Sequence, residues 1–469
     1  MNRIAVLNVV GMCDRHITRD MRFARLYRNN GRRAFIDPAF PAVTTTAQSN
    51  YLTGQTPSSH GIVGNGWYDR ELAEVQFWKQ SNHLVGAPKI WESLRAKDEE
   101  FTCAKIFWWY NMYSSADLSI TPRPMYPADG RKVFDVYTSP MGMRETIKHD
   151  LGEFPFPGFW GPAAGAQTPQ GTPDCATRWI AESARWIEEK HTPTLSLVYL
   201  PHLDYNLQRL GPEAKEARDD LYLADELVSD LVKFYEKRGV RVLLLSEYGL
   251  SEVQRPIHLN RLFRQQGWLS IKEELGLELL DPGASRAFAV ADHQVAHVYI
   301  NDPAIIKPVQ ALLEKTDGVQ FVLDDEGKNE RGVAHGRAGD LIAIAEEDAW
   351  FTYYYWQDDT CAPDFARTVD IHRKPGYDPA ELFIDPQIGF PKAHIAWRLL
   401  QKKLGFRMLM DVIPLDASLV KGSHGCCPVS RADWPVIISP EPDWLPDEVI
   451  DSTDVRAIIE RAVTGEKAR

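Results

Sequence analysis

Strand-length apolar runs that alternate with helical patterns constrain the fold of this chain most strongly. The apolar runs cover residues 4–10, 103–108, 194–200 and 240–245, and the helical patterns cover residues 89–96, 175–189 and 213–237. Runs that are apolar throughout are typical of parallel strands that are buried on both faces of a sheet. We therefore predict an α/β fold, a three-layer sandwich with a largely parallel central sheet.

The pattern changes near residue 267. Strands are predicted at 288–300 and 339–346 and a helix at 305–315, followed by a helix at 391–404, a last strand at 434–439 and a terminal helix at 452–462. We interpret residues 267–385 as an inserted α+β cap, and residues 1–266 and 386–469 as the two parts of one core. No internal repeat or flexible linker separates them.

Composition argues against a nucleic-acid-binding, a membrane-spanning and a disulfide-rich protein. The chain has 469 residues, of which 44% are hydrophobic, and a formal charge of −12 argues against a nucleic-acid-binding surface. No apolar run reaches the roughly eighteen residues that a membrane-spanning helix needs, and residues 4–10 are too short for the apolar part of a signal peptide. The six cysteines are scattered, so we expect no disulfide framework. A cytoplasmic protein without a membrane partner is predicted.

Residues 40–46, with 51–54 and 60–65, form the most informative motif. A Thr44 hydroxyl at the start of a short helix would meet unpaired backbone N–H groups and the positive end of the helix dipole. This environment suits an attacking oxygen and a bound phosphate. Taken alone, however, Thr44 would more often be an ordinary N-cap.

The longer string, Phe40-Pro41 to Thr44 followed by Thr53-Gly54 and His60-Gly61-Ile62, resembles the nucleotide pyrophosphatase/phosphodiesterase and phosphonoacetate hydrolase branch of the alkaline phosphatase superfamily. The resemblance implies an alkaline-phosphatase-like sandwich and a hydrolase of the type I phosphodiesterase class. It also implies a threonine nucleophile, Thr44, and two metal ions held by aspartates and histidines. Asp204 and His424 match two of those ligand positions.

Other positions depart from the family pattern. The aspartate expected after the first strand is Val10, the second histidine of the D-x-x-x-H motif is Gln208, and D-H-G becomes Glu247-Tyr248-Gly249. An asparagine expected three residues after Thr44 is Ala47. Val10 and Tyr248 cannot supply the ligands expected at their positions. Gln208 offers only a weak amide oxygen, and Glu247 keeps a carboxylate on a longer side chain.

The remaining metal ligands by this comparison are Asp204, Gln208, Glu247 and His424. Such an oxygen-rich set does not suit a two-zinc centre, and we expect at most one divalent cation, Mg, Mn or Ca, or none. Candidates for replacement ligands are His202, residues 292–297, and Cys426 and Cys427. His293 and His297 would lie about 13 Å apart on one strand, so they are not expected to share a metal.

Aromatic residues and cations follow the second strand. Residues 107–110 lead into a polar loop at 121–132, which could face the same cleft as Thr44. The predicted substrate-binding residues are Asn65, Trp109, Tyr110, Arg123 and Tyr248. Arg131 and Lys132 either bind an anionic group or belong to a solvated loop.

Two functions stay open. The first is a phosphodiesterase-like hydrolase or related transferase that acts on a small molecule, with Thr44, Glu247 and Asp204 as catalytic residues and a possible place in small-molecule biosynthesis. The second is a protein that keeps the fold and binds a small anionic or aromatic ligand without catalysis. The sequence does not define the oligomeric state.

Overall fold

The computed structural model describes residues 1–129, 131–165 and 175–466. Its centre is a nine-stranded sheet with the order β21-β2-β20-β9-β1-β8-β5-β6-β7. The strands are β1 (Ile4–Val9), β2 (Arg32–Asp37), β5 (Cys103–Ile106), β6 (Leu118–Pro122), β7 (Val136–Ser139), β8 (Leu195–Leu200), β9 (Arg241–Leu245), β20 (Val436–Ser439) and β21 (Val449–Asp451). Strand β1 pairs in parallel with both β8 and β9, and β5 pairs in parallel with β6 and β8. The predicted α/β fold with a largely parallel sheet is confirmed.

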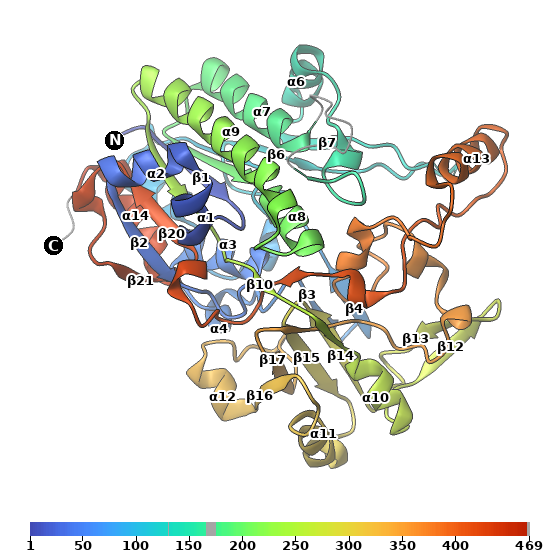
Figure 1. Cartoon of the computed structure of the whole chain (residues 1–469). Coiled ribbons are helices and arrows are strands. Elements are labelled where there is room, and N and C mark those ends of the chain that lie inside the picture. Colours follow the sequence, from blue (N-terminus) through green and yellow to red (C-terminus); the bar gives the residue numbers. More distant parts are fainter. Residues whose placement is uncertain (130, 166–174, 467–469) are drawn as a thin grey trace.

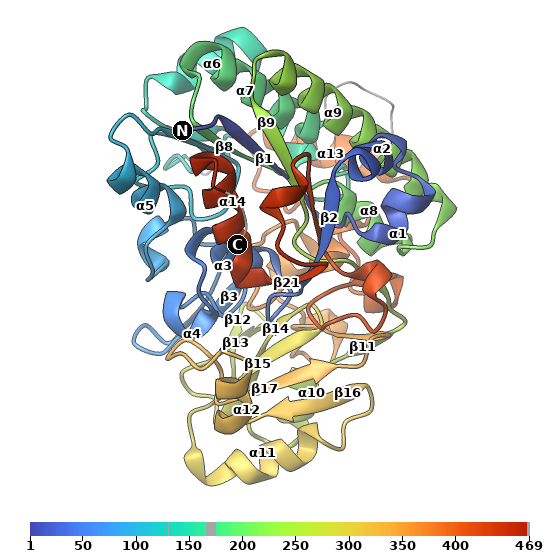
Figure 2. The same ribbon diagram turned by 90° about the vertical axis from the view of Figure 1, so that its left-hand side faces the viewer.

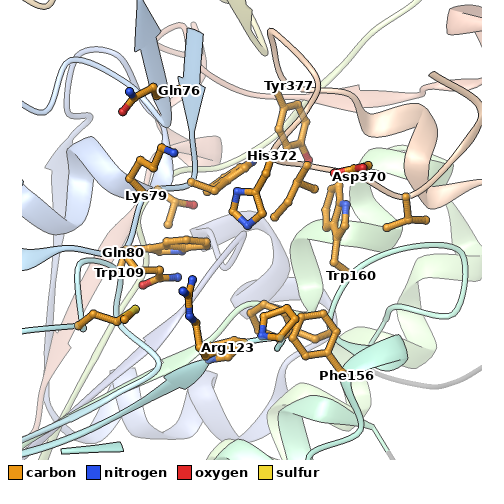
Figure 3. A pocket seen from close by; sticks show the side chains of 18 of the residues that line it. Gln76, Lys79, Gln80, Trp109, Arg123, Phe156, Trp160, Asp370, His372 and Tyr377 are labelled. Atoms are coloured by element: carbon orange, nitrogen blue, oxygen red, sulfur yellow. The ribbon is translucent and has the colours of Figure 1, made fainter. Parts of the chain in front are cut away.

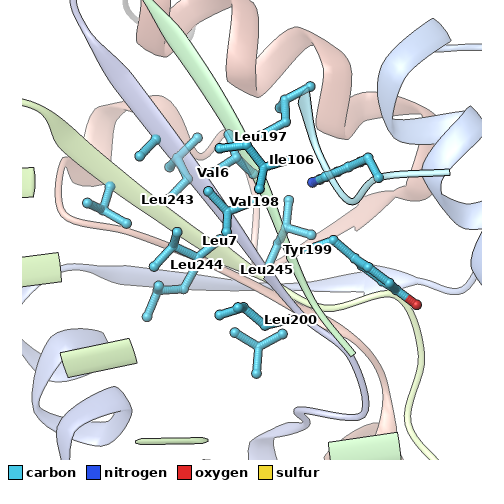
Figure 4. Close-up of a cluster of buried hydrophobic side chains, with 14 of the residues drawn as sticks. Val6, Leu7, Ile106, Leu197, Val198, Tyr199, Leu200, Leu243, Leu244 and Leu245 are labelled. Atoms are coloured by element: carbon cyan, nitrogen blue, oxygen red, sulfur yellow. The ribbon is translucent and has the colours of Figure 1, made fainter. Parts of the chain in front are cut away.

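Helices cover both faces of this sheet (Figures 1 and 2). Helices α7 (Ala176–His191) and α9 (Arg218–Lys237) lie on one face, and α3 (Thr44–Thr53) and α14 (Val455–Thr464) lie on the other. The sheet residues between them are fully buried, as Figure 4 shows for Val6, Leu197 and Leu244. This double cover explains why the central strands are mostly apolar, with few polar residues such as Asn8 and Lys105. Helix α9 begins later than the predicted residue 213, after a short turn of 3₁₀ helix.

The remaining helices lie elsewhere along the chain. They are α1 (Asp14–Arg19), α2 (Arg22–Asn30), α4 (Pro57–His60), α5 (Ile90–Lys97), α6 (Met143–Leu151), α8 (Leu203–Leu210), α10 (Leu259–Gln265), α11 (Ile306–Leu313), α12 (Asp325–Glu330) and α13 (Pro391–Lys403). Among the described helices, none is both long enough and apolar enough to cross a membrane. The cytoplasmic location stays a prediction.

A second, antiparallel sheet follows the first in sequence. Its order is β14-β15-β17-β16, with β14 (Ala287–Asp292), β15 (Val295–Ile300), β16 (Val319–Leu323) and β17 (Leu341–Ala345). The prediction of one strand over 288–300 was wrong, because this segment is the β14–β15 hairpin with His293 in the turn at a φ of 61°. The apolar pattern continues on both sides of this tight turn, and only the three polar residues 292–294 mark it in the sequence. The domain boundaries at 266/267 and 385/386 stay a prediction.

Four two-stranded pairs complete the structure. They are β3 (Gly66–Asp69) with β4 (Glu74–Phe77), β10 (Ser251–Glu252) with β19 (Gly422–Ser423), β11 (Arg255–Ile257) with β18 (Ala349–Phe351), and β12 (Ile271–Glu274) with β13 (Leu277–Leu280). The pairing of Ser251 with Ser423 matters most for the site. It brings the segment that follows β9 next to the late segment that carries His424.

Candidate active site

Five side chains from four separate segments meet at the carboxyl end of the central strands. Asp204 follows β8 on α8, Glu247 and Tyr248 follow β9, Thr44 begins α3, and His424 follows β19. All five are buried. Parallel strands place their carboxyl ends at one edge of a sheet, which is where ligands bind in α/β proteins. The structure therefore brings together the residues that the family comparison singled out.

Thr44 is the first residue of α3, and Val43 occupies the N-cap position. The Thr44 side chain does not cap the helix, so the N-cap alternative does not apply. Its Oγ1 instead lies 3.1 Å from the hydroxyl oxygen of Tyr248. The next two threonines point elsewhere: Thr45 donates to the Gly64 carbonyl at 2.8 Å, and Thr46 donates to the Ile62 carbonyl at 3.1 Å. Only Thr44 of the three lines the cavity described below.

Asp204 and His424 face each other across a short gap. His424 Nδ1 lies 2.8 Å from the Ala42 carbonyl oxygen, so Nδ1 carries the hydrogen and Nε2 presents its lone pair. That Nε2 is 3.9 Å from Asp204 Oδ1, and neither atom has a hydrogen-bond partner among the described residues. Burial raises the pKa of Asp204 to about 7 and lowers the pKa of His424 to about 3. A proton or a single cation would satisfy both atoms.

Gln208, predicted as a weak metal ligand, has both ends of its amide engaged. Its Nε2 donates to Asp204 Oδ2 at 2.8 Å, and its Oε1 accepts from the Tyr377 hydroxyl at 2.9 Å. In this arrangement Gln208 orients the Asp204 carboxyl group and joins it to Tyr377.

A column of four buried rings stands beside this pair. Tyr248 stacks on His424 with ring centroids 3.6 Å apart, His424 on His293 at 3.6 Å, and His293 on Tyr377 at 3.7 Å. His293 reaches the column from the β14–β15 turn. Burial and the neighbouring His424 hold the pKa of His293 well below its usual value, so the column is uncharged.

Glu247 lies behind Thr44 and does not line the cavity. Its Oε1 accepts from Asn8 Nδ2 at 2.5 Å and from Gln48 Nε2 at 2.6 Å. Burial raises the pKa of Glu247 to about 8, although contacts with Gln48, Asn8 and Thr44 act in the opposite direction. Gln48 Oε1 in turn accepts from the backbone N–H of Trp109 at 2.8 Å. Glu247 is thus connected through Gln48 to one wall of the cavity.

These residues do not fit a centre with two metal ions. Val10 supplies no donor, and the Tyr248 ring takes the place of a ligand, with its hydroxyl 3.1 Å from Thr44 Oγ1. Glu247 offers only Oε2, because its Oε1 already accepts two hydrogen bonds. Among the described residues, no group of three or more His, Cys, Asp or Glu side chains could hold a metal ion. What fits is one pair of donors, Asp204 Oδ1 and His424 Nε2.

A cavity of about 560 Å³ opens above Thr44 (Figure 3). Thr44, Asp204, Tyr248 and His293 form its floor. The walls carry aromatic rings and cations, and they include Trp78, Lys79, Trp109, Arg123, Tyr126, Lys132, Phe156, Trp160, Asp370, His372 and Tyr377. Trp78 and Trp109 pack together with centroids 4.7 Å apart. Among the described residues, Lys79, Arg123 and Lys132 form no ion pair, so their charges are available to a ligand.

Two predicted substrate-binding residues lie outside this lining. Asn65 Oδ1 accepts from the Thr45 N–H at 3.2 Å, and its Nδ2 donates to Asp292 at 3.0 Å. Asn65 therefore supports the first turn of α3. The Tyr110 carbonyl accepts from Lys105 Nζ at 2.8 Å, and the Tyr110 ring is buried. Trp109, Arg123 and Tyr248 line the cavity, and their role in binding a substrate stays a prediction.

The candidates for replacement ligands have other surroundings. His297 Nε2 contacts the Val63 carbonyl at 2.9 Å, and its Nδ1 accepts from the Gly339 N–H at 3.1 Å. His202 packs edge-on against Phe159 and Tyr205. The buried Cys426 thiol donates to Gln294 at 3.1 Å, whereas Cys427 is exposed. Arg131 pairs with Asp129 at 2.7 Å and does not line the cavity.

Sequence reasoning did not identify Trp78, Lys79, Trp160 and Tyr377 as wall residues. It considered His293 only as a metal ligand. The wall residues come from loops far apart in sequence, and no local pattern marks them. His293 had a signal, because the polar residues Asp292, His293 and Gln294 interrupt an apolar run.

Comparisons with known proteins agree on one family. The sequence model described as type I phosphodiesterase/nucleotide pyrophosphatase matches residues 4–378. An uncharacterized pyrophosphatase/phosphodiesterase of Schizosaccharomyces pombe is 24% identical over 240 residues, which are 49% of this chain and 41% of that protein. The chain thus matches about two-fifths of the length of this relative.

Solved structures show the same fold. Murine ectonucleotide pyrophosphatase/phosphodiesterase 5, an inactive threonine-to-alanine variant in complex with AMP, has a TM-score of 0.59 and 12% identity, and the match covers 99% of this chain and 95% of that one. Phosphonoacetate hydrolase from Sinorhizobium meliloti 1021 in complex with phosphonoformate has a TM-score of 0.60 and 13% identity, with 99% and 96% covered. At these identities the likeness shows the fold alone.

Proposed function

The chain belongs to the type I phosphodiesterase/nucleotide pyrophosphatase family, a family of hydrolases, and we propose that it uses Thr44 as the nucleophile on a small phosphorus ester. The observation that carries this proposal is the position of the Thr44 hydroxyl. It lies at the floor of the large cavity, at the start of a helix, and is oriented by the Tyr248 hydroxyl at 3.1 Å. A helix start favours both an attacking oxygen and the negative charge of a phosphoryl group.

Asp204 is the residue that we assign to take the proton from Thr44. Tyr248 contacts both side chains, since its hydroxyl lies beside Thr44 and its hydrogen bond lowers the pKa of Asp204. The proton can pass from Thr44 to the Tyr248 oxygen while the Tyr248 proton passes to Asp204. The Thr44 oxygen then bonds to phosphorus as the ester bond to the leaving group breaks. In a hydrolase, water releases the phosphoryl group from Thr44, and in a transferase another hydroxyl does so.

Glu247 acts in this proposal as a positioning residue. It lies behind Thr44 and holds Gln48, which holds the backbone of Trp109. These hydrogen bonds therefore fix the position of Thr44 relative to the Trp109 wall of the cavity. A raised pKa, near 8, keeps the Glu247 carboxyl group largely neutral at pH 7, so the buried floor carries no second negative charge against an anionic substrate.

The substrate class follows from the walls. Arg123, Lys79 and Lys132 would bind an anionic group, and the Trp78–Trp109 pair offers an apolar surface for a flat or hydrocarbon part. The related structures contain AMP in one case and phosphonoformate in the other, which are both small anionic molecules. A small anionic ester with an aromatic or apolar portion fits the whole cavity. A step in small-molecule biosynthesis is part of this proposal.

A reduced metal site completes the proposal. We assign at most one divalent cation, Mg, Mn or Ca, to Asp204 Oδ1 and His424 Nε2, two facing buried atoms that have no hydrogen-bond partner among the described residues. Bound there, it would add positive charge near the phosphoryl oxygens. Each step above is carried by side chains of the chain itself.

The test is direct observation of the covalent intermediate. The purified protein would be incubated with a panel of aryl phosphodiesters and nucleotide esters, quenched in acid and digested for mass spectrometry. The proposal expects a phosphoryl-type adduct on Thr44 and none on Thr45 or Thr46. Turnover without an adduct on Thr44, even in rapid-quench samples, would contradict the nucleophile assignment.

The alternative is a protein that binds such a ligand without cleaving it. Tyr248 takes the position of a histidine ligand of the second metal ion in the family pattern, and its ring stacks on His424. This arrangement favours the alternative. Saturable binding of panel members in calorimetry, together with neither turnover nor adduct, would support it.

A further inference from the structure

We propose that helix α13 and the turn that follows it form a docking surface for an anionic lipid bilayer. This inference is independent of the proposed function. Figure 1 shows α13 at the edge of the molecule, away from the central sheet. None of its residues is buried, unlike those of every other helix with thirteen or more residues in the described chain.

One face of α13 carries an apolar stripe that nothing covers. Ala393, Trp397, Leu400 and Leu404 are spaced by four, three and four residues, so they share one side of the helix. The exposed fractions are 56% for Trp397 and 63% for Leu404. Phe390 before the helix and Phe406 after it are exposed as well, the latter by 66%. A row of large apolar side chains in this state marks an interaction surface.

The opposite side of α13 packs against the segment that contains residues 411–413. Arg398 pairs with Asp411 at 2.7 Å, and His394 Nε2 lies 2.9 Å from the same carboxylate. Ile395 packs on Val412 and Ile413, in a cluster that also includes Val369 from the cavity wall. The apolar stripe is therefore held outward by its anchored back and is not free to fold inward.

The charges around α13 indicate which binding partner the apolar stripe would contact. Lys392, Lys402, Lys403 and Arg407 lie within or just after α13, and none forms an ion pair within the described residues. No Asp or Glu occurs from residue 386 to residue 410, although the whole chain has a formal charge of −12. An apolar face with Trp and Phe beside uncompensated Lys and Arg is typical of helices that lie in an anionic membrane interface.

A second copy of the chain fits this surface less well. Two such helices would place eight unpaired cations against each other without a carboxylate in either segment to pair with them. The helix has thirteen residues, too few to span a bilayer, so it would lie in the interface plane.

The test is co-sedimentation of the full-length protein with sucrose-loaded vesicles. The vesicles would contain either phosphatidylcholine alone or phosphatidylcholine with 30% phosphatidylglycerol. We expect the protein to pellet with the anionic vesicles and to be released as salt is raised, because each cation near such a surface contributes about fivefold to binding. Failure to pellet with the anionic vesicles at low salt would overturn the proposal.

Paired variants separate the two contributions. Trp397→Glu with Leu404→Glu should abolish vesicle binding, and Lys402→Glu with Lys403→Glu should weaken it by at least about 25-fold. Lys307→Glu with Lys315→Glu, which changes exposed lysines on and beside α11, is the matched control and should bind as the parent does. If sedimentation velocity instead shows a dimer that only the Trp397 and Leu404 variant disrupts, the stripe is a contact between copies and the membrane proposal is wrong.

Discussion

The floor and the walls of the cavity differ in how their side chains are held. On the floor, Thr44, Tyr248 and His293 are buried and are held by the Thr44–Tyr248 hydrogen bond and by ring contacts with His424 and Tyr377. On the walls, Arg123 and Lys132 are exposed, and their charges face the cavity without an ion pair among the described residues. The floor therefore constrains which reaction the protein can perform, whereas the walls constrain which molecule it can accept.

The floor also differs from what the family comparison implied. Where the family pattern has two metal ions, this chain has a column of four rings beside the facing atoms Asp204 Oδ1 and His424 Nε2, which have no hydrogen-bond partner among the described residues. Part of the positive charge that metals would provide is available instead from the cations of the walls. The predictions below separate these two contributions.

Removal of the nucleophile should have the largest effect. Thr44→Ala should lower turnover by at least about a thousandfold, because loss of a nucleophile removes the covalent route. The fold should survive, since loss of the hydrogen bond to Tyr248 costs about 0.5–1.5 kcal/mol. Steady-state kinetics and urea unfolding would measure the two effects. Thr46→Ala, which removes a neighbouring buried hydroxyl outside the cavity, is the control, and equal losses in both variants would argue against a special role for Thr44.

Restoring the missing metal ligands should turn the floor of the cavity into a zinc-binding site. A variant with Val10→Asp, Gln208→His, Glu247→Asp and Tyr248→His should bind zinc at least about a hundredfold more tightly than the parent, because it supplies the missing donors and removes a ring from the second position. Competition with a chromogenic chelator would measure the affinity. A control that keeps Tyr248 and carries the other three changes should gain less. An unchanged zinc affinity in a folded fourfold variant would mean that the backbone does not hold the family geometry.

Changes to the walls should affect binding more than chemistry. Arg123→Ala should raise KM about 10- to 100-fold with a smaller change in kcat, since a charge-assisted hydrogen bond contributes about 1.5–3 kcal/mol. Arg131→Ala is the matched control, because Arg131 pairs with Asp129 and does not line the cavity. A loss confined to kcat in the Arg123 variant would place this residue in the chemical step instead.

The smallest predicted effect concerns stability and pH. Lys105 is buried, donates to the Trp109 and Tyr110 carbonyls at 2.6 and 2.8 Å, and has its pKa lowered by burial to about 7. The unfolded chain, with an ordinary lysine pKa, binds the proton more tightly, so this group makes the free energy of unfolding rise with pH from about 7 to about 10. Lys105→Met should reduce that rise by about 1–2 kcal/mol between pH 7 and pH 9 in urea titrations. Identical slopes in both proteins would mean that Lys105 stays charged.

The sequence was sufficient for the large sheet, because strands covered on both faces leave predominantly apolar runs such as that of β1. It was also sufficient for Thr44, Asp204 and His424, which stand in recognisable local motifs. It failed at His293, because a hairpin and a single strand share the same alternation when the turn is tight. It also failed at Trp78 and Tyr377, whose positions depend on loops that meet only in the folded chain.

The central claim is that this chain performs family chemistry with a reduced metal site. Metal analysis of the purified, unchelated protein by mass spectrometry, after equilibration with zinc, magnesium, manganese and calcium, tests it most directly. The account predicts at most one equivalent of a divalent cation, lost when Asp204→Asn and His424→Ala are combined. Two tightly bound equivalents of zinc, with zinc-dependent phosphodiesterase turnover, would contradict it.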